Sequence, residues 1–148
     1  MMQLHSIESL ASGQRALRSR FDDFRQALRN RNKTALEIAL FDFEQQLRRW
    51  TEAEEASLVP AVERAGVPGR DPRRELRLEF VQLRELAGFI VKQVASDVPA
   101  RDLTGYIENL DRRLHAHEDG LRTVYYPAAS TSLTTDEWSA LLAARPEP

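Results

Sequence analysis

Six residues in the first half of the chain follow one another at steps of three or four positions, a spacing that puts them on one face of an α-helix: Leu40, Phe43, Leu47, Trp50, Glu54 and Leu58. Five of them are apolar, as expected for a face that packs into a core. Glu54 is the exception. A charged carboxylate left alone in a core costs several kcal/mol, so Glu54 must be paired, hydrogen-bonded, bound to a metal or protonated.

Similar rows of apolar residues at helical spacing recur along the chain, separated by clusters of Gly, Pro and Asn. They predict helices at about 6–30, 34–65, 72–95, 100–126 and 135–144. The short connections favour antiparallel neighbours. We therefore predict an all-α fold, an antiparallel up-down-up-down four-helix bundle with a short C-terminal helix, in one domain over residues 1–148.

Local signals support several helix ends. Asp71 followed by Pro72 is typical of a helix N-terminus. Thr134 and Glu137 have the spacing of a capping box, which indicates that the last helix begins there. Pro127 cannot continue the backbone hydrogen bonds of the fourth helix, so we predict a loop from Pro127 to Leu133.

Polar side chains interrupt two other rows: Gln14 in the first helix and His117 in the fourth. We expect Glu54 and His117 to come from opposite hairpins and to point at one another, with the amide of Gln14 in the same network. This cluster could be a structural ion pair or hydrogen bond, a pocket for a small ligand or a site for one metal ion, and its histidine makes it a candidate pH switch. Three tyrosines around the fourth helix could direct hydroxyls to the cluster or to the surface: Tyr106, Tyr125 and Tyr126.

Composition excludes several classes of function. The formal charge of −2 argues against binding to nucleic acid or to an anionic membrane. The chain has no cysteine, which rules out disulfides and thiol chemistry and fits a cytoplasmic location. We expect no signal peptide and no transmembrane segment, because no basic start precedes an apolar run and no such run approaches about 20 residues. No catalytic motif stands out, so we expect a non-enzymatic protein.

Two segments carry a resemblance to a known family. EEASLVP begins with Glu54, four residues after Trp50, and HAHEDGLRTVYYP contains His117 ten residues before a proline. Over Leu10 to Pro127 the chain resembles the hemerythrin-like cation-binding domains. The resemblance implies a four-helix bundle that binds two non-haem irons through His and carboxylate ligands, for oxygen carriage or for sensing of oxygen or iron.

Most ligand positions of that family are substituted here. Glu54 and His117 keep ligand chemistry, and Glu79 matches an acidic residue that often precedes the third-helix histidine. The other four positions hold residues that are poor ligands or none: Gln14, Trp50 and Phe80 in place of histidines, and Leu121 in place of a carboxylate.

The resulting prediction is a non-enzymatic hemerythrin-like domain that acts as a binding or regulatory module. Its former di-iron centre is degenerate and metal-free, a pocket or packed core of Gln14, Trp50, Glu54, Phe80, His117 and Leu121. One alternative is an iron-binding protein for oxygen, redox or iron sensing, with Glu54 and His117 as metal ligands. Another is a haem or small ligand beside His117. We expect no cofactor, with iron as the alternative, and a small ligand or a protein as partner of a monomer or homodimer.

Overall fold

The computed structural model describes residues 2–147, with side chains from residue 7 onward. All regular secondary structure in this part of the chain is helical, which confirms the predicted all-α class. Four long helices come first, close to the predicted ranges: α1 (Met2–Arg29), α2 (Lys33–Ala65), α3 (Pro72–Ala95) and α4 (Ala100–Gly120). They are followed by a π-helical turn, η1 (Leu121–Tyr125), and by α5 (Tyr126–Ala129) and α6 (Thr135–Ala144).

The helix ends follow from local chemistry. The Asp71 side chain accepts a hydrogen bond from a backbone N–H in the first turn of α3, and Pro72 begins that helix. Thr134 and Glu137 form the predicted capping box of α6. Gly66 follows α2 with φ of 72°, a left-handed conformation that glycine adopts without strain.

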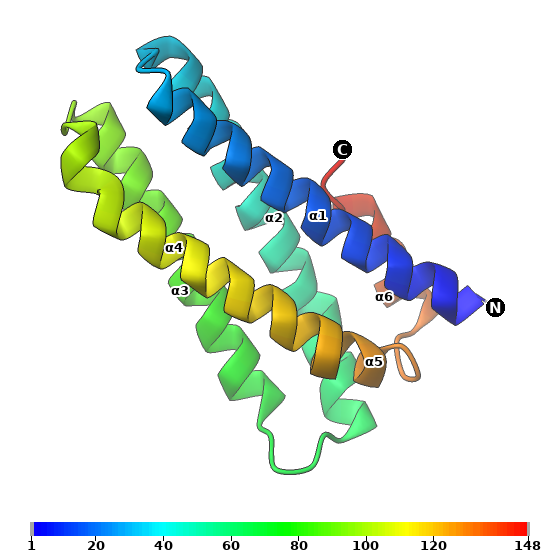
Figure 1. Cartoon of the computed structure of the whole chain (residues 1–148). Coiled ribbons are helices and arrows are strands. Elements are labelled where there is room, and N and C mark those ends of the chain that lie inside the picture. The colour runs from blue at the N-terminus through cyan, green and yellow to red at the C-terminus, as the bar shows by residue number, and fades with distance from the viewer. Residues whose placement is uncertain (1, 148) are drawn as a thin grey trace.

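The long helices form a bundle in which α1 packs along α2, α2 along α3 and α3 along α4. Figure 1 shows the α1–α2 and α3–α4 connections at one end of the molecule and the α2–α3 connection at the other. The short helix α6 lies across α1 and α2. Ion pairs bridge α1 to α4, with Arg18 Nη1 2.5 Å from Asp111 Oδ1 and Arg18 Nη2 3.3 Å from Glu118 Oε1.

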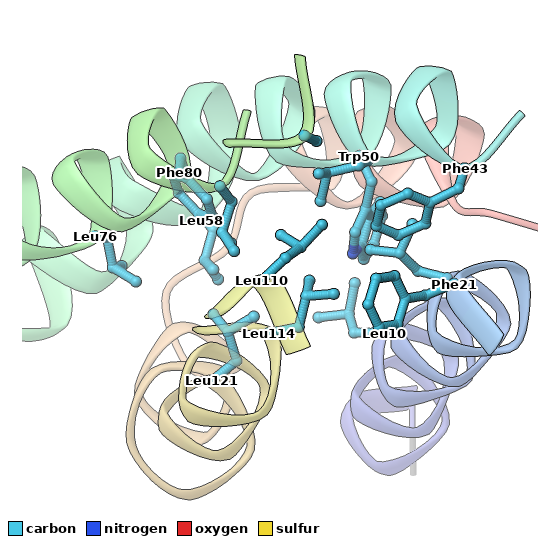
Figure 2. Close-up of a cluster of buried hydrophobic side chains, with 14 of the residues drawn as sticks. Leu10, Phe21, Phe43, Trp50, Leu58, Leu76, Phe80, Leu110, Leu114 and Leu121 are labelled. Carbon is cyan, nitrogen blue, oxygen red and sulfur yellow. The ribbon is translucent and has the colours of Figure 1, made fainter. Parts of the chain in front are cut away.

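The core lies between all four long helices. Figure 2 shows side chains from each of them pointing into a common interior, among them Leu10, Trp50, Phe80 and Leu114. Trp50 and Phe80 are fully buried. No helix in residues 2–147 is both long enough and apolar enough to cross a membrane.

The helical backbone continues past the predicted end of the fourth helix. Instead of a loop from Pro127, α5 runs from Tyr126 to Ala129. Pro127 stands in the first turn of α5, where a missing N–H costs least. The π-turn before it carries a hydrogen bond from Tyr126 N–H to the carbonyl of Leu121, five residues back. The chain thus passes the proline through a widened turn rather than by ending the helix.

Candidate functional site: a buried carboxylate with an amide and a phenol

Glu54 is fully buried on the inner face of α2, and both of its carboxyl oxygens have partners. The Tyr126 hydroxyl donates to Glu54 Oε2 at 2.8 Å, and Gln14 Nε2 donates to Glu54 Oε1 at 3.3 Å. Gln14 Nε2 also donates to the Tyr126 hydroxyl oxygen at 3.0 Å. The three side chains therefore form a closed triangle of hydrogen bonds, which we call the Glu54 cluster.

The π-turn positions Tyr126 in this cluster. An uninterrupted α-helix would place Val124 on the inner row, as the sequence spacing predicts. In the structure Val124 is half-buried, whereas Tyr125 and Tyr126 are both buried. The extra residue in the π-turn shifts the inward position by one, and this shift brings the phenol of Tyr126 to Glu54.

Burial controls the protonation of the cluster. Desolvation raises the pKa of Glu54 to about 7, although His117 and the hydrogen bonds from Tyr126 and Gln14 act to lower it. Burial, together with the nearby Glu54 carboxylate, raises the pKa of Tyr126 well above its ordinary value. Tyr126 therefore stays neutral and donates its proton, while Glu54 changes charge near neutral pH.

His117 lies at the edge of this cluster and pairs elsewhere. It is 3% exposed, its Nδ1 atom is 3.2 Å from Glu79 Oε1, and its ring packs edge-to-face on Phe80 with centroids 5.1 Å apart. The expected direct pair with Glu54 is not formed. Gln14 and Tyr126 already engage both oxygens of Glu54, and Glu79 reaches the histidine from α3. The influence of His117 on the pKa of Glu54 is electrostatic, without a hydrogen bond between the two side chains.

All six residues that the sequence assigns to the former centre are buried: Gln14, Trp50, Glu54, Phe80, His117 and Leu121. Three of them have a buried polar atom without a hydrogen-bond partner in the protein, namely Gln14 Oε1, Trp50 Nε1 and His117 Nε2. Buried polar atoms normally have partners, so this region has unused hydrogen-bonding capacity.

The residues do not fit a two-iron centre. Such a centre draws several imidazole and carboxylate ligands to one point, and residues 7–147 bring no three His, Asp or Glu side chains together in that way. Glu54 and His117 have separate partners, and the aromatic rings of Trp50 and Phe80 fill two of the positions where the resemblance implies histidines.

Sequence reasoning found Glu54, Gln14 and His117 but did not assign the partners that hold two of them. Tyr126 appears in the sequence as one of three tyrosines that could face the site or the surface, and only the π-turn decides between these orientations. Glu79 appears only as an acidic residue before Phe80. The direction of its side chain depends on how α3 packs against α4.

The fold and the cluster define the class of this protein: an all-helical bundle that buries a carboxylate held by an amide and a phenol. Comparison of the chain with models of known protein families, with curated proteins and with solved structures found no match.

Proposed function

We propose that this protein is a non-enzymatic binding or regulatory module of hemerythrin-like type, in which a polar cluster made by the protein alone has replaced the di-iron centre. The observation that carries the proposal is the pairing of both Glu54 oxygens with Gln14 and Tyr126. A carboxylate that bridges metals in a hemerythrin-like centre is here satisfied by an amide and a phenol.

The proposed architecture is an antiparallel up-down-up-down four-helix bundle. Its support is the short connection after each of the first three helices, together with the alternation of these connections between the two ends of the molecule (Figure 1). The family-like spacing of Trp50 before Pro60 and of His117 before Pro127 supports the same assignment.

The metal-free state is supported by what surrounds the two remaining ligand residues. Both oxygens of Glu54 already accept hydrogen bonds, and within residues 7–147 no third His, Asp or Glu joins Glu54 and His117 in a group that could hold a metal ion. Trp50 and Phe80 add ring volume at positions where the resemblance implies imidazoles.

A binding or regulatory role is supported by the chemistry of the cluster. Glu54 changes charge near pH 7, and Gln14 and Tyr126 also line a surface groove. A ligand in the groove would contact Gln14 and Tyr126, so its binding can change the protonation of Glu54. We infer a small molecule or a protein as the partner of a cytoplasmic monomer or homodimer, with neither nucleic acid nor membrane involved, from the balanced charge and the absence of cysteine.

Elemental analysis and iron titration of protein produced in iron-rich medium test this function. We expect iron far below stoichiometric amounts in wild-type protein, and the same low value in Glu54→Gln and His117→Asn variants. Stoichiometric iron that disappears in both variants would overturn the proposal in favour of the iron-sensing alternative.

The absorption spectrum of the same preparation tests the haem alternative. His117 Nε2 has no partner within the protein, and an imidazole nitrogen of this kind is the atom that ligates haem iron. We expect no Soret band in the purified protein, and no shift of the Soret band of added haemin. A Soret band in the purified protein, or a shift of the haemin band, that is lost in His117→Asn would establish haem binding instead.

A further inference from the structure

A groove of about 400 Å³ runs between α1 and the end of α4. Two buried residues of the Glu54 cluster, Gln14 and Tyr126, line it from the inside. Charged side chains from both helices line the rest, including Arg18 and Glu118. We call this the α1–α4 groove. Its volume lies within the range of pockets for small organic ligands.

Buried polar atoms that make no hydrogen bond concentrate at this groove. Within residues 7–147, six buried side-chain atoms have no hydrogen-bond partner, and three of them belong to residues that line it: Gln14 Oε1, Arg18 Nη2 and Glu118 Oε1. Gln14 is itself 7% exposed. Arg18 Nη2 and Glu118 Oε1 lie 3.3 Å apart and form an ion pair with each other. The groove thus offers one acceptor that the fold does not use, Gln14 Oε1, beside an ion pair of opposite charges.

We propose that the α1–α4 groove binds a small zwitterion of the amino-acid type, which inserts between Arg18 and Glu118 and replaces their ion pair by two ion pairs with the ligand. The ammonium group of the ligand donates to Gln14 Oε1 and Glu118 Oε1, and its carboxylate accepts from Arg18 Nη2. The inference rests on the proposed binding role and specifies the class of ligand. Because the three atoms are covered, the ligand enters by rotation of flexible side chains, among them Arg15 and Arg122 at the rim, whose ion pairs with Glu8 and Asp119 are exposed to solvent.

The balance of charge selects a zwitterion over a simple ion. A phosphate or another anion would approach the carboxylates of Glu118 and Asp119, and a simple cation would approach the guanidinium of Arg18. A molecule with both charges places each beside its opposite. Burial raises the pKa of Glu118, so an ammonium group at this position would stabilise its ionised form.

Amide NMR titrations of the full chain with glycine, alanine, glutamate and lysine, and with acetate and methylammonium as fragments, test the proposal. We expect at least one amino acid to give saturable shifts of the Gln14 side-chain amide and of residues 115–122, with an affinity roughly tenfold or more above either fragment. Glu118→Gln should weaken this binding roughly tenfold, by loss of a charged hydrogen-bond partner.

Two further variants keep the result decisive. Glu108→Gln makes the same chemical change at an exposed position of α4 outside the groove and should leave the affinity unchanged. Ala11→Phe fills the groove and leaves the hydrogen bonds of Glu54 in place, so it should abolish binding. No saturable shifts, equal affinity for acetate, or equal effects of Glu118→Gln and Glu108→Gln would overturn the inference. Iron measured in the same sample separates the failure of this inference from the failure of the proposed function. Protein that is free of iron and binds no amino acid contradicts the class of ligand and leaves the metal-free module in place.

Discussion

The hydroxyl of Tyr126 donates to Glu54 Oε2 across 2.8 Å and joins two residues that lie 72 positions apart in the sequence. This hydrogen bond connects the middle of α2 to the turn that follows the π-helical segment. Gln14 of α1 bonds to both partners, so one buried carboxyl group joins α1, α2 and α5.

Tyr126→Phe should destabilise the protein by about 1–3 kcal/mol, because it removes a donor to Glu54 and an acceptor from Gln14 while it keeps the ring. Urea denaturation measures this loss. Tyr125→Phe is the matched control: its hydroxyl donates to Glu75 at 3.1 Å in a partly exposed position, so its loss should be smaller. Equal losses would contradict a central role for the Glu54 cluster.

Stability should fall as pH rises, because of Glu54. The pKa of Glu54 is about 7 in the folded protein, and its ordinary value is 4.5. Between these two pH values the folded state therefore binds a proton that the unfolded state has lost. The contribution is fully present below about pH 4.5 and is lost as pH rises through about 7, a loss of about 3 kcal/mol. Unfolding free energies from urea denaturation at several pH values measure it. Glu54→Gln removes the titrating group, and an unchanged pH slope in this variant would contradict the assignment.

Glu54 and His117 should behave nearly independently at pH 5, where Glu54 is protonated, because they share no hydrogen bond. In a double-mutant cycle with Glu54→Gln and His117→Asn, the effects should add within about 0.5 kcal/mol. The cycle of Glu54→Gln with Gln14→Leu should instead show coupling of roughly 0.5–3 kcal/mol, because these side chains are in contact. Strong coupling in the first cycle would restore the direct pair predicted from the sequence.

Three helix-interior glycines should respond differently to alanine. A Cβ atom at Gly13 would lie 2.7 Å from Arg145 Cγ and 3.3 Å from Trp50 Cζ2, and the buried indole cannot move away easily. At Gly88 and Gly105 the same atom meets nothing within 4 Å. Thermal unfolding should show that Gly88→Ala and Gly105→Ala stabilise the protein by about 0.5–1 kcal/mol, as helix propensity predicts. Gly13→Ala should gain nothing, and an equal gain there would show that Trp50 is loosely packed.

The sequence predicts the helices well because their signals are local. Apolar spacing and caps such as Asp71 and Thr134 depend on neighbours within a few residues. The same spacing correctly buries Gln14, Glu54 and His117. The sequence does not predict the partners of these residues. The inward direction of Tyr126 depends on one π-helical turn, and the contact of Glu79 with His117 depends on how two helices pack. Neither leaves a periodic pattern in the sequence.

The widened turn at Leu121–Tyr125 also sets how the chain tolerates changes in its length. A π-turn is an α-helix with one surplus residue, so deletion of the exposed Thr123 would let this segment become an ordinary α-helix and leave Tyr126 facing the core. A deletion earlier in α4 would instead rotate the side chains between the deletion and the π-turn by about 100° about the helix axis. The protein can therefore lose a residue at one point of this helix and keep its buried phenol in place.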